Sequence, residues 1–343
     1  MTQADDAPRQ AMLDLIFGYR ATQLVALAAR LEIAERLADG PHTAEELARA
    51  TGTHPEALYR ALRALASLGV FEELDGRHFT LTPLGERLQA AHPQSVRPQA
   101  LFAVGETYRA WAELPYSVAT GETGFDRLYG MSHFAWLAEH PEENALFNQV
   151  MTAGSAQAAD AVVAAYDFGA SGTVVDVAGG QGMLLSAVLL AHPGLRGVLF
   201  DQPHVVESAE PTLRDAGVAE RCEIVSGDFF ASVPPGGDVY TLQRVIHDWD
   251  DERAIAILRS CAQALGPGGK VLLIEQVMPP GPGAGPSAGR AASLDVQMLI
   301  MMGGHERTAA EFERLFSAAG LRLTRIIPTQ AGASVIEAER GEA

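Results

Sequence analysis

The sequence predicts an α/β protein in which a Rossmann-like sheet, covered by helices on both faces, follows a smaller, mostly helical winged-helix domain. From about residue 173 onward, strand-like runs alternate with helical runs, a pattern typical of a parallel sheet between two helical layers. The first hundred residues instead give helix, turn, helix and hairpin. A chain of 343 residues is sufficient for two domains, which we expect at residues 1–97 and 98–343.

Local signals define the elements of the first domain. Thr43 followed by Glu46 predicts a capping box that opens a helix. Two apolar rows at helical spacing predict a helix before this box and another after Thr53: Leu24, Leu27, Leu31 and Ile33, and then Leu58, Leu62, Leu65 and Leu68. Gly69 ends the second row, and the runs VFEEL and HFTLT around an Asp-Gly pair predict a β-hairpin.

A winged-helix pattern is compatible with DNA binding and with a packing or dimerisation module. A recognition helix needs basic residues near its start and flanks. Here Arg60 and Arg63 are surrounded by acidic residues: Glu45, Glu46, Glu56, Glu72, Glu73 and Asp75. The net charge of −18 also disfavours binding to nucleic-acid phosphates and to an anionic membrane surface. We therefore favour a dimerisation module and expect a homodimer without nucleic-acid or membrane partners.

The composition favours a cytoplasmic protein. No run of about 18 uncharged apolar residues is present, so no membrane-spanning helix is expected. The N-terminal sequence MTQADDAPRQ is polar and acidic, unlike a secretory signal. Cys222 and Cys261 are too few for a disulfide framework or a thiolate metal site, and we expect them to be free thiols.

A mostly helical connector is predicted from about residue 98 to residue 166, and it is rich in aromatic residues. Aromatic residues at this density usually belong to a core, although some could wall a pocket for a flat ligand. Glycines and prolines in the stretch 279–290 predict a mobile loop. The runs LRLTRIIPT and SVIEAER predict two strands that complete the sheet.

The first strand of the predicted sheet, TVVDV, ends in a glycine loop whose charge indicates its ligand. Asp176 lies beside the loop Ala178–Gly182, and no Lys or Arg lies within a dozen residues on either side. This carboxylate would repel a pyrophosphate, whereas S-adenosylmethionine carries an ammonium and a sulfonium that a carboxylate attracts. The glycines let the backbone approach a ligand closely. A glycine loop alone remains a weak signal.

Acidic residues also end the next two predicted strands. Asp201 lies about where a Rossmann-like fold has the acid that binds ribose hydroxyls. Asp228 and Phe229 end the third strand, where a carboxylate and a ring could hold an adenine. Any one of these aspartates alone could be a helix cap. Three acids at three successive strand ends favour a site for S-adenosylmethionine.

Two motifs in the second domain resemble one family. The run from Arg244 to Asp251 reads RVIHDWDD, and the run from Gly303 to Thr308 reads GGHERT. Paired at this spacing, they resemble the metal-independent small-molecule O-methyltransferases, which include caffeic-acid-type enzymes of plants, hydroxyindole O-methyltransferase and bacterial enzymes acting on polyketides and antibiotics. The resemblance covers about residues 11–338. It implies an S-adenosylmethionine-dependent O-methyltransferase whose winged-helix part is a dimerisation domain.

The resemblance also implies roles for individual residues. His247 matches the catalytic base, and Glu275 and Glu306 match two acids that flank it. The expected cofactor contacts are Asp176, Ala178, Gly179, Gly180, Gly182, Asp201, Asp228, Phe229 and Gln243. The expected substrate contacts are Phe147, Met151, Asp248, Met298 and Met302. Two positions depart from the family pattern, because Ala178 replaces the usual first glycine of the loop and Gln243 replaces a lysine of the plant relatives.

The implied reaction transfers the methyl group of S-adenosylmethionine, by in-line displacement, to a hydroxyl of an aromatic small molecule from bacterial secondary metabolism. The leaving group is S-adenosylhomocysteine. The hydroxyl is expected to be phenolic. A phenol has a pKa about 3.5 units above that of a free histidine, so complete proton transfer before attack would cost about 4.8 kcal/mol. We therefore expect the proton to move to His247 as the carbon–oxygen bond forms. A carboxylate on the other ring nitrogen would raise the basicity of the histidine and fix its tautomer.

Other interpretations remain open at this point. Asp248, Asp250 and Asp251 could suggest a magnesium site, but Mg²⁺ normally takes one or two carboxylates and several waters, so we expect no metal. Asp250 or Asp251 is better suited to cap the helix that follows. A family member could also bind S-adenosylmethionine but hydroxylate or decarboxylate a polyketide. A winged-helix DNA-binding regulator is the more remote alternative.

Overall fold

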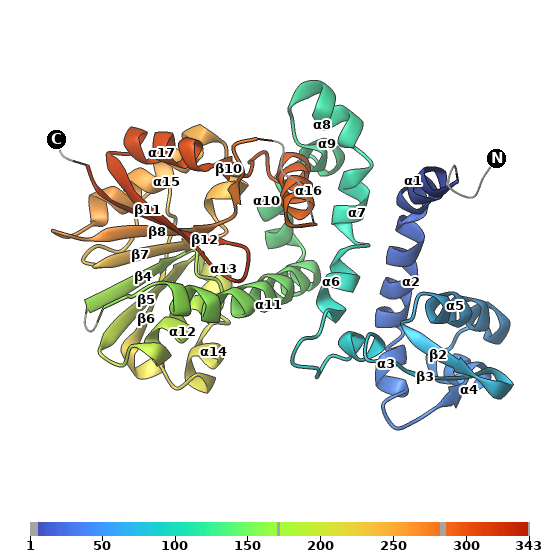
Figure 1. The fold of residues 1–343 in the computed structure, drawn as a ribbon. Coiled ribbons are helices and arrows are strands. Elements are labelled where there is room, and N and C mark those ends of the chain that lie inside the picture. The colour runs from blue at the N-terminus through green and yellow to red at the C-terminus, as the bar shows by residue number, and fades with distance from the viewer. Residues whose placement is uncertain (1–5, 170–171, 282–285, 342–343) are drawn as a thin grey trace. The chain divides into compact units, whose positions relative to one another are not determined.

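The computed structural model describes residues 6–169, 172–281 and 286–341 (Figure 1). The chain divides into two compact units, Met1–Arg109 and Ala110–Ala343. The predicted end of the winged-helix part at residue 97 lies inside the first unit and stays a prediction.

The first unit combines helices with a small antiparallel sheet. Its helices are α1 (Ala7–Phe17), α2 (Tyr19–Arg30), α3 (Ile33–Arg36), α4 (Ala44–Thr51), α5 (Pro55–Ser67) and α6 (Arg97–Phe102). Its strands, in the order β1-β3-β2, are β1 (His42–Thr43), β2 (Phe71–Leu74) and β3 (His78–Leu81). The predicted helix, helix and hairpin pattern is therefore present.

Most of the predicted end signals act as expected. The Thr43 hydroxyl accepts a hydrogen bond from the Glu46 amide at 3.1 Å, and the Glu46 carboxylate accepts one from the Thr43 amide at 2.8 Å, which completes the capping box. Helix α5 begins after His54 rather than after Thr53, because the His54 ring caps the amide of Ala57. The first apolar row is split between α2 and α3 at Glu32, whose φ is +53°.

Helix α1 exposes an apolar surface. None of the side chains in this described helix is buried, and Met12, Leu15, Ile16 and Phe17 are 40–77% exposed. No single described helix is long and apolar enough to cross a membrane; α1 and α2 meet the length and composition test only as a pair bent by 43°.

The second unit is built on a seven-stranded sheet. Its strands are β4 (Gly172–Val177), β5 (Leu195–Asp201), β6 (Cys222–Ser226), β7 (Val239–Gln243), β8 (Lys270–Glu275), β11 (Leu321–Pro328) and β12 (Ser334–Arg340). Their order is β11-β12-β8-β7-β4-β5-β6. Strands β4, β5, β6, β7 and β8 run parallel to one another. At one edge, β12 pairs antiparallel with β8, and β11 pairs antiparallel with β12. The predicted parallel sheet is thus mixed at the edge formed by its two last strands.

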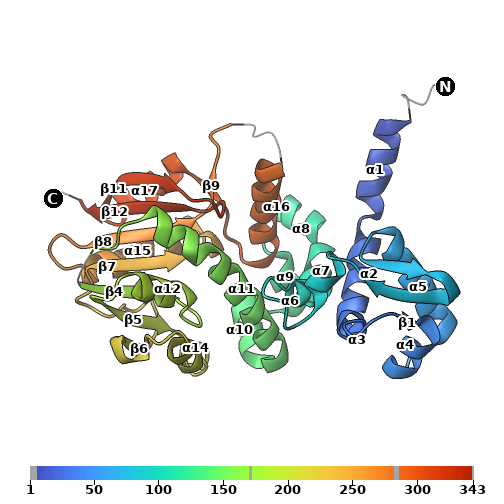
Figure 2. The ribbon, with the colours of Figure 1, turned by 60° about the horizontal axis from the view of Figure 1, so that its bottom comes forward.

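Helices cover both faces of this sheet (Figures 1 and 2). Alternate side chains of each buried strand point to opposite faces. Val175 and Val177 pack with α15 (Asp251–Ala264) and α17 (Ala309–Ala318). Val174 packs on the other face with α11 (Pro141–Ala165), α12 (Met183–Ala191) and α14 (Glu210–Asp215). The sheet is therefore the middle layer between two apolar cores.

Further elements complete the second unit. They are α7 (Glu106–Trp111), which crosses the division, α8 (Leu114–Thr120), α9 (Gly124–Tyr129), α10 (His133–Glu139), α13 (Pro203–Val206), α16 (Pro286–Met301), β9 (Val277–Met278) and β10 (Arg307–Thr308). The loop predicted at 279–290 is shorter than expected, because α16 begins at Pro286, a residue that the first turn of a helix tolerates. Residues 282–285 of that prediction lie outside the described part of the chain.

Candidate active site

A cavity lies at the carboxyl ends of β4, β5 and β7. It has a volume of about 1150 Å³, which includes space open to solvent. Strand β4 has β5 on one side and β7 on the other, so this edge is the point where the order of connections reverses. Ligands of open α/β sheets bind at such a point. Asp176, Asp201 and Gln243, predicted from the sequence to contact the cofactor, all line this cavity.

The glycine loop after β4 has a conformation that few side chains tolerate. Gly180 and Gly182 have φ of +58° and +77°, and Ala178 has φ +55°. A Cβ atom at Gly179 would lie 2.5 Å from Leu199 and 2.7 Å from Asp176, so only glycine fits there. Ala178, the departure from the family pattern, therefore has a left-handed backbone in which a side chain is strained.

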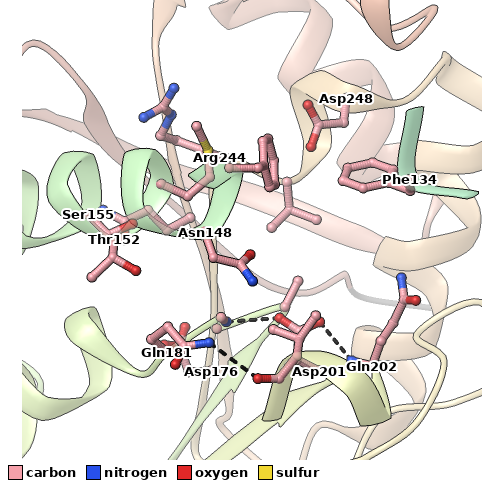
Figure 3. Close-up of a pocket in the computed structure, with 18 of the residues that line it drawn as sticks. Phe134, Asn148, Thr152, Ser155, Asp176, Gln181, Asp201, Gln202, Arg244 and Asp248 are labelled. Carbon is pink, nitrogen blue, oxygen red and sulfur yellow. Dashed lines mark hydrogen bonds between the residues drawn. The ribbon is translucent and has the colours of Figure 1, made fainter. Parts of the chain in front are cut away.

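Asp201 ties the end of β5 to the glycine loop (Figure 3). Its carboxylate accepts hydrogen bonds from the amide of Gly180 at 2.8 Å and from that of Gln202 at 2.7 Å. Burial raises the pKa of Asp201, although both amides act in the opposite direction. The carboxylate is thus fixed at the cavity wall by two backbone amides.

Among the described residues that line the cavity, two have a buried side-chain polar atom without a hydrogen-bond partner. One such atom is Oδ2 of Asp176, whose Oδ1 accepts a hydrogen bond from the Thr241 hydroxyl at 2.7 Å. The other is Nε2 of Gln243. Burial raises the pKa of Asp176 to about 7. An unpaired buried acceptor and donor in one cavity wall are suited to a ligand that supplies a donor and an acceptor.

Helix α11 supplies another wall of the cavity. Phe147 and Met151, predicted substrate contacts, line it together with Asn144 and Asn148. The rings of Phe134 and Trp249, which also line it, are stacked with centroids 5.9 Å apart. The cavity therefore combines flat apolar surfaces with amide groups.

Arg244 brings a positive charge to the cavity. It follows β7, has φ +55° and lines the cavity beside Gln243. A Cβ atom at Gly154 of α11 would lie 2.9 Å from Nη1 of Arg244, so the guanidinium lies close against that helix. The absence of Lys and Arg near the glycine loop in sequence therefore does not extend to the whole cavity.

His247 lies in a short 3-10 turn, Ile246–Asp248, that follows β7. The residue is 5% exposed, and its Nδ1 lies 2.7 Å from Oε1 of Glu306 and 3.8 Å from Oε2 of Glu275. Its Nε2 lies 3.5 Å from Oδ1 of Asp248, which lines the cavity. The three residues predicted to form the catalytic set thus lie together, and Asp248 is the side chain that links His247 to the cavity.

The electrostatics of this cluster favour a protonated imidazole. Burial alone lowers the pKa of His247, but the carboxylates of Glu275, Asp248 and Glu306 outweigh it and raise the pKa to about 9. Burial raises the pKa of Glu275 and of Asp248. Ligand atoms of His247, Glu275 and Glu306 all lie within 4.8 Å of one another, so by distance alone they could also hold a cation.

Comparisons with known proteins identify the family. The O-methyltransferase domain matches residues 111–322, and the O-methyltransferase dimerisation domain matches residues 13–90. The chain belongs to the O-methyltransferase family.

Two bacterial relatives of this methyltransferase are themselves named O-methyltransferases. It is 47% identical over 327 residues to the phenazine O-methyltransferase PhzM of Lysobacter antibioticus, and 95% of each chain is covered. It is 40% identical over 333 residues to the mitomycin biosynthesis 6-O-methyltransferase of Streptomyces lavendulae, with 96% of this chain and 94% of the relative covered.

A similar solved structure holds the expected cofactor. It is an O-methyltransferase from neocarzinostatin biosynthesis in complex with S-adenosylmethionine and 2-hydroxy-5-methyl naphthoic acid. Its TM-score is 0.82 at 37% sequence identity, with 93% of this chain and 96% of that chain covered. The present chain is an S-adenosylmethionine-dependent O-methyltransferase, so the predicted fold class, enzyme class and cofactor are confirmed.

The comparisons also decide between alternatives. The match of residues 13–90 confirms that the winged-helix part is a dimerisation domain. The relatives are named methyltransferases, so hydroxylation or decarboxylation is not favoured. The cytoplasmic location and the absence of nucleic-acid and membrane partners stay predictions.

Some predicted site residues of the methyltransferase lie apart from the cavity lining. Gly182 caps α12, and Asp228 is exposed and accepts a hydrogen bond from the amide of Phe230, whereas Phe229 lines the cavity. Met302 packs in an apolar cluster with α10, and Met298 is buried, but neither side chain lines the cavity. Contacts of these four residues with cofactor or substrate stay predictions.

Several residues that line the cavity of the methyltransferase have no clear signal in the sequence, among them Arg244, Asn144 and Asn148. Arg244 stands inside the recognised RVIHDWDD motif, so its charge was visible but its direction was not. Asn144 and Asn148 are four residues apart in a largely apolar segment, a spacing that brings both to one helix face. Of the two predicted caps, Asp250 is the residue that accepts the Arg253 amide, at 2.8 Å.

Proposed function

We propose that this enzyme methylates a phenolic hydroxyl of an aromatic bacterial secondary metabolite, with His247 as the general base. The observation that carries the proposal is the buried His247–Glu306 pair, at 2.7 Å, next to the cavity residue Asp248. Relatives are named for phenazine, for mitomycin biosynthesis and for 3-amino-4-hydroxybenzoate, which supports an aromatic acceptor.

The charges of the cavity suit S-adenosylmethionine, which supplies an electrophilic methyl group on its sulfonium. Asp176 and Asp201 offer carboxylates to its cationic and hydroxyl groups, and Phe229 offers a ring face to its adenine. Arg244 offers the countercharge for its α-carboxylate, because among the described lining residues it alone has a permanently positive side chain. The unpaired Nε2 of Gln243 remains a donor for the same ligand.

The proposed base is oriented by its acid neighbours. A carboxylate on Nδ1 favours the tautomer with its hydrogen there, which leaves Nε2 free to accept a proton. Nε2 is the nitrogen on the side of Asp248. The hydroxyl proton of the acceptor would pass to this atom as the new bond forms, while Asp248 orients the hydroxyl.

The aromatic wall supports a flat acceptor. The stacked rings of Phe134 and Trp249, with Phe147 and Met151, can enclose a ring system, while Asn144 and Asn148 can bind its polar edge. Their amides both donate and accept hydrogen bonds, so they suit carbonyl or hydroxyl substituents.

We propose a homodimer through the first unit. The exposed apolar side chains of α1 would be covered by a second copy, as its dimerisation-domain match suggests. A monomeric mass by light scattering at micromolar concentration would contradict this assignment.

The experiment that tests the function is a transfer assay with methyl-labelled S-adenosylmethionine. A panel of phenols, of matched anilines and of the same rings without either group is offered with EDTA present. We expect label only on the phenols, unchanged by EDTA, since the proposed base needs no metal. Transfer to anilines alone, or loss of transfer in EDTA, would refute the corresponding part of the proposal.

A further inference from the structure

Arg307 is the largest fully buried side chain among the described residues. Its guanidinium has an acceptor for each of its five hydrogens. Nε and Nη2 donate to Oδ1 of Asp251 at 3.0 and 2.8 Å, and Nη2 also donates to the carbonyl of Trp249 at 2.8 Å. Nη1 donates to the carbonyls of Ile246 at 2.9 Å and His305 at 3.4 Å. Such complete pairing compensates for the burial of its charge.

These contacts hold the backbone on both sides of the proposed base, His247. The carbonyls of Ile246 and Trp249 stand on either side of His247 in the chain, and Arg307 holds both. On the amide side, Oε1 of Glu275 accepts hydrogen bonds from Val245 at 3.0 Å and Ile246 at 2.8 Å. The buried Glu275 thus binds N–H groups of the turn, and the buried Arg307 binds its carbonyl groups.

The segment that carries Arg307 lies directly against the same turn. A Cβ atom at Gly304 would lie 2.1 Å from the carbonyl oxygen of His247, so the two backbones touch. Arg307 of β10 pairs with Val277 of β9, two residues after Glu275. Two neighbouring residues therefore position His247: Glu306 binds its imidazole, and Arg307 binds the backbone of its turn.

We propose that Arg307 is a positioning residue that fixes the backbone turn of His247, so that Nε2 stays beside the cavity residue Asp248 while Glu306 binds Nδ1. This inference rests on the proposed role of His247. A lysine would keep the charge but has three donors on one atom, so it cannot bridge both carbonyls and Asp251. A displacement of about 1 Å at a catalytic group can lower the rate about 10²-fold.

The test compares Arg307→Lys with Arg259→Lys, each in the wild-type and in the His247→Ala background. Arg259 is a matched control, because it makes an exposed hydrogen bond to the carbonyl of Ala318. We expect Arg307→Lys to lower kcat by about 10²-fold with calorimetric affinity for S-adenosylmethionine unchanged. In the His247→Ala background it should change kcat by less than about two-fold, since coupled residues are not additive.

The outcomes separate this inference from the proposed function. A folded Arg307→Lys variant with normal kcat, or with equal losses in both backgrounds, overturns the positioning role and leaves the base intact. Full activity of His247→Ala overturns the base itself, and the positioning role with it. If thermal unfolding shows that Arg307→Lys does not fold, Asp251→Asn is tested in its place. This variant weakens the contact between the guanidinium and its exposed partner Asp251. Unchanged kcat and an unchanged pH profile in that variant also overturn the inference.

Discussion

Oε1 of Glu306 lies 2.7 Å from Nδ1 of His247, and each residue is only 5% exposed. At this distance the carboxylate fixes both the orientation of the ring and the position of its hydrogen. It also favours the protonated ring, so one contact affects both the geometry and the basicity of the proposed base. The first two predictions separate these effects.

His247→Ala should lower turnover by about 10²–10⁴-fold, the usual contribution of a positioned acid–base group. Affinity for S-adenosylmethionine should barely change. The loss should shrink for acceptors with more acidic hydroxyls, because these arrive already ionised. Glu306→Gln and Glu275→Gln should give smaller losses, since these acids orient the ring and its turn. Steady-state kinetics over a series of phenols measures all three effects.

The exposed Glu313 provides a matched control for the two glutamate variants. Glu313→Gln should leave turnover unchanged. Near-normal turnover of His247→Ala on a weakly acidic phenol would mean that the enzyme acts by proximity alone, and the assignment of the base would be wrong.

The pH profile should reflect the raised pKa of His247. A base with a pKa of about 9 is mostly protonated at neutral pH, so the neutral, competent form grows as pH rises towards 9. We expect kcat/KM, which reports the free enzyme, to rise between about pH 7 and pH 9 and then to level off. An acceptor that is ionised throughout, and the His247→Ala variant, should both lack this limb.

The same shift has a consequence for stability. Since the folded pKa of about 9 exceeds the reference value of 6.5, the protonated ring stabilises the fold fully below pH 6.5. That contribution is lost as pH rises through 9. Wild-type protein should therefore lose more stability than His247→Ala between these pH values in urea titrations. Equal losses would show that the ring is neutral in the folded protein.

Asp201→Ala should weaken the binding of S-adenosylmethionine. A lost charge-assisted hydrogen bond costs about 1.5–3 kcal/mol, and the variant also frees the amide of Gly180 in the glycine loop. Asp201→Asn keeps one acceptor oxygen and should lose less. Asp228→Ala should lose least, because Asp228 is exposed and apart from the cavity lining. Calorimetry measures the affinity of each of the three variants. If Asp228→Ala lost more affinity than Asp201→Ala, Asp228 rather than Asp201 would be the cofactor contact.

The strands and the catalytic cluster could be predicted because their signals lie in the chain itself. Val174 and Val175 pack in cores on opposite faces of the sheet, and both are apolar. Consecutive apolar residues of this kind predict a strand that is buried on both faces. His247 and Glu306 lie 59 residues apart, and only the paired motifs joined them before the fold was known.

Other features depend on backbone conformations that residue types do not report. Arg244 enters the cavity through a φ of +55°, and Glu32 divides the first apolar row through a φ of +53°. Non-glycine residues rarely adopt such values, so no pattern predicted them. Pro286 begins a helix inside a stretch whose glycines and prolines predicted a loop.

The last prediction concerns the far end of α11, the helix that walls the cavity. Tyr166 ends this helix, and its hydroxyl donates to Oε2 of Glu337 at 2.6 Å. Glu337, 3% exposed, also accepts hydrogen bonds from Lys270 at 3.0 Å, Arg325 at 2.9 Å and Thr324 at 2.6 Å. One carboxylate thus joins the helix to three strands of the sheet.

Glu337→Gln should destabilise the second unit by about 1–3 kcal/mol, because its amide has one acceptor oxygen where the carboxylate has two, so some of these donors lose their partner. Burial alone would raise the pKa of Glu337, but the hydrogen bonds from Arg325, Thr324, Tyr166 and Lys270 lower it to about 2. The stabilisation is therefore present above the reference pKa of 4.5 and is lost as pH falls through 2. Glu339→Gln, an exposed position on the same strand, should cost much less. Urea unfolding at several pH values should give a difference between wild type and Glu337→Gln that narrows with acid. A constant difference would mean that Glu337 acts through its shape rather than its charge.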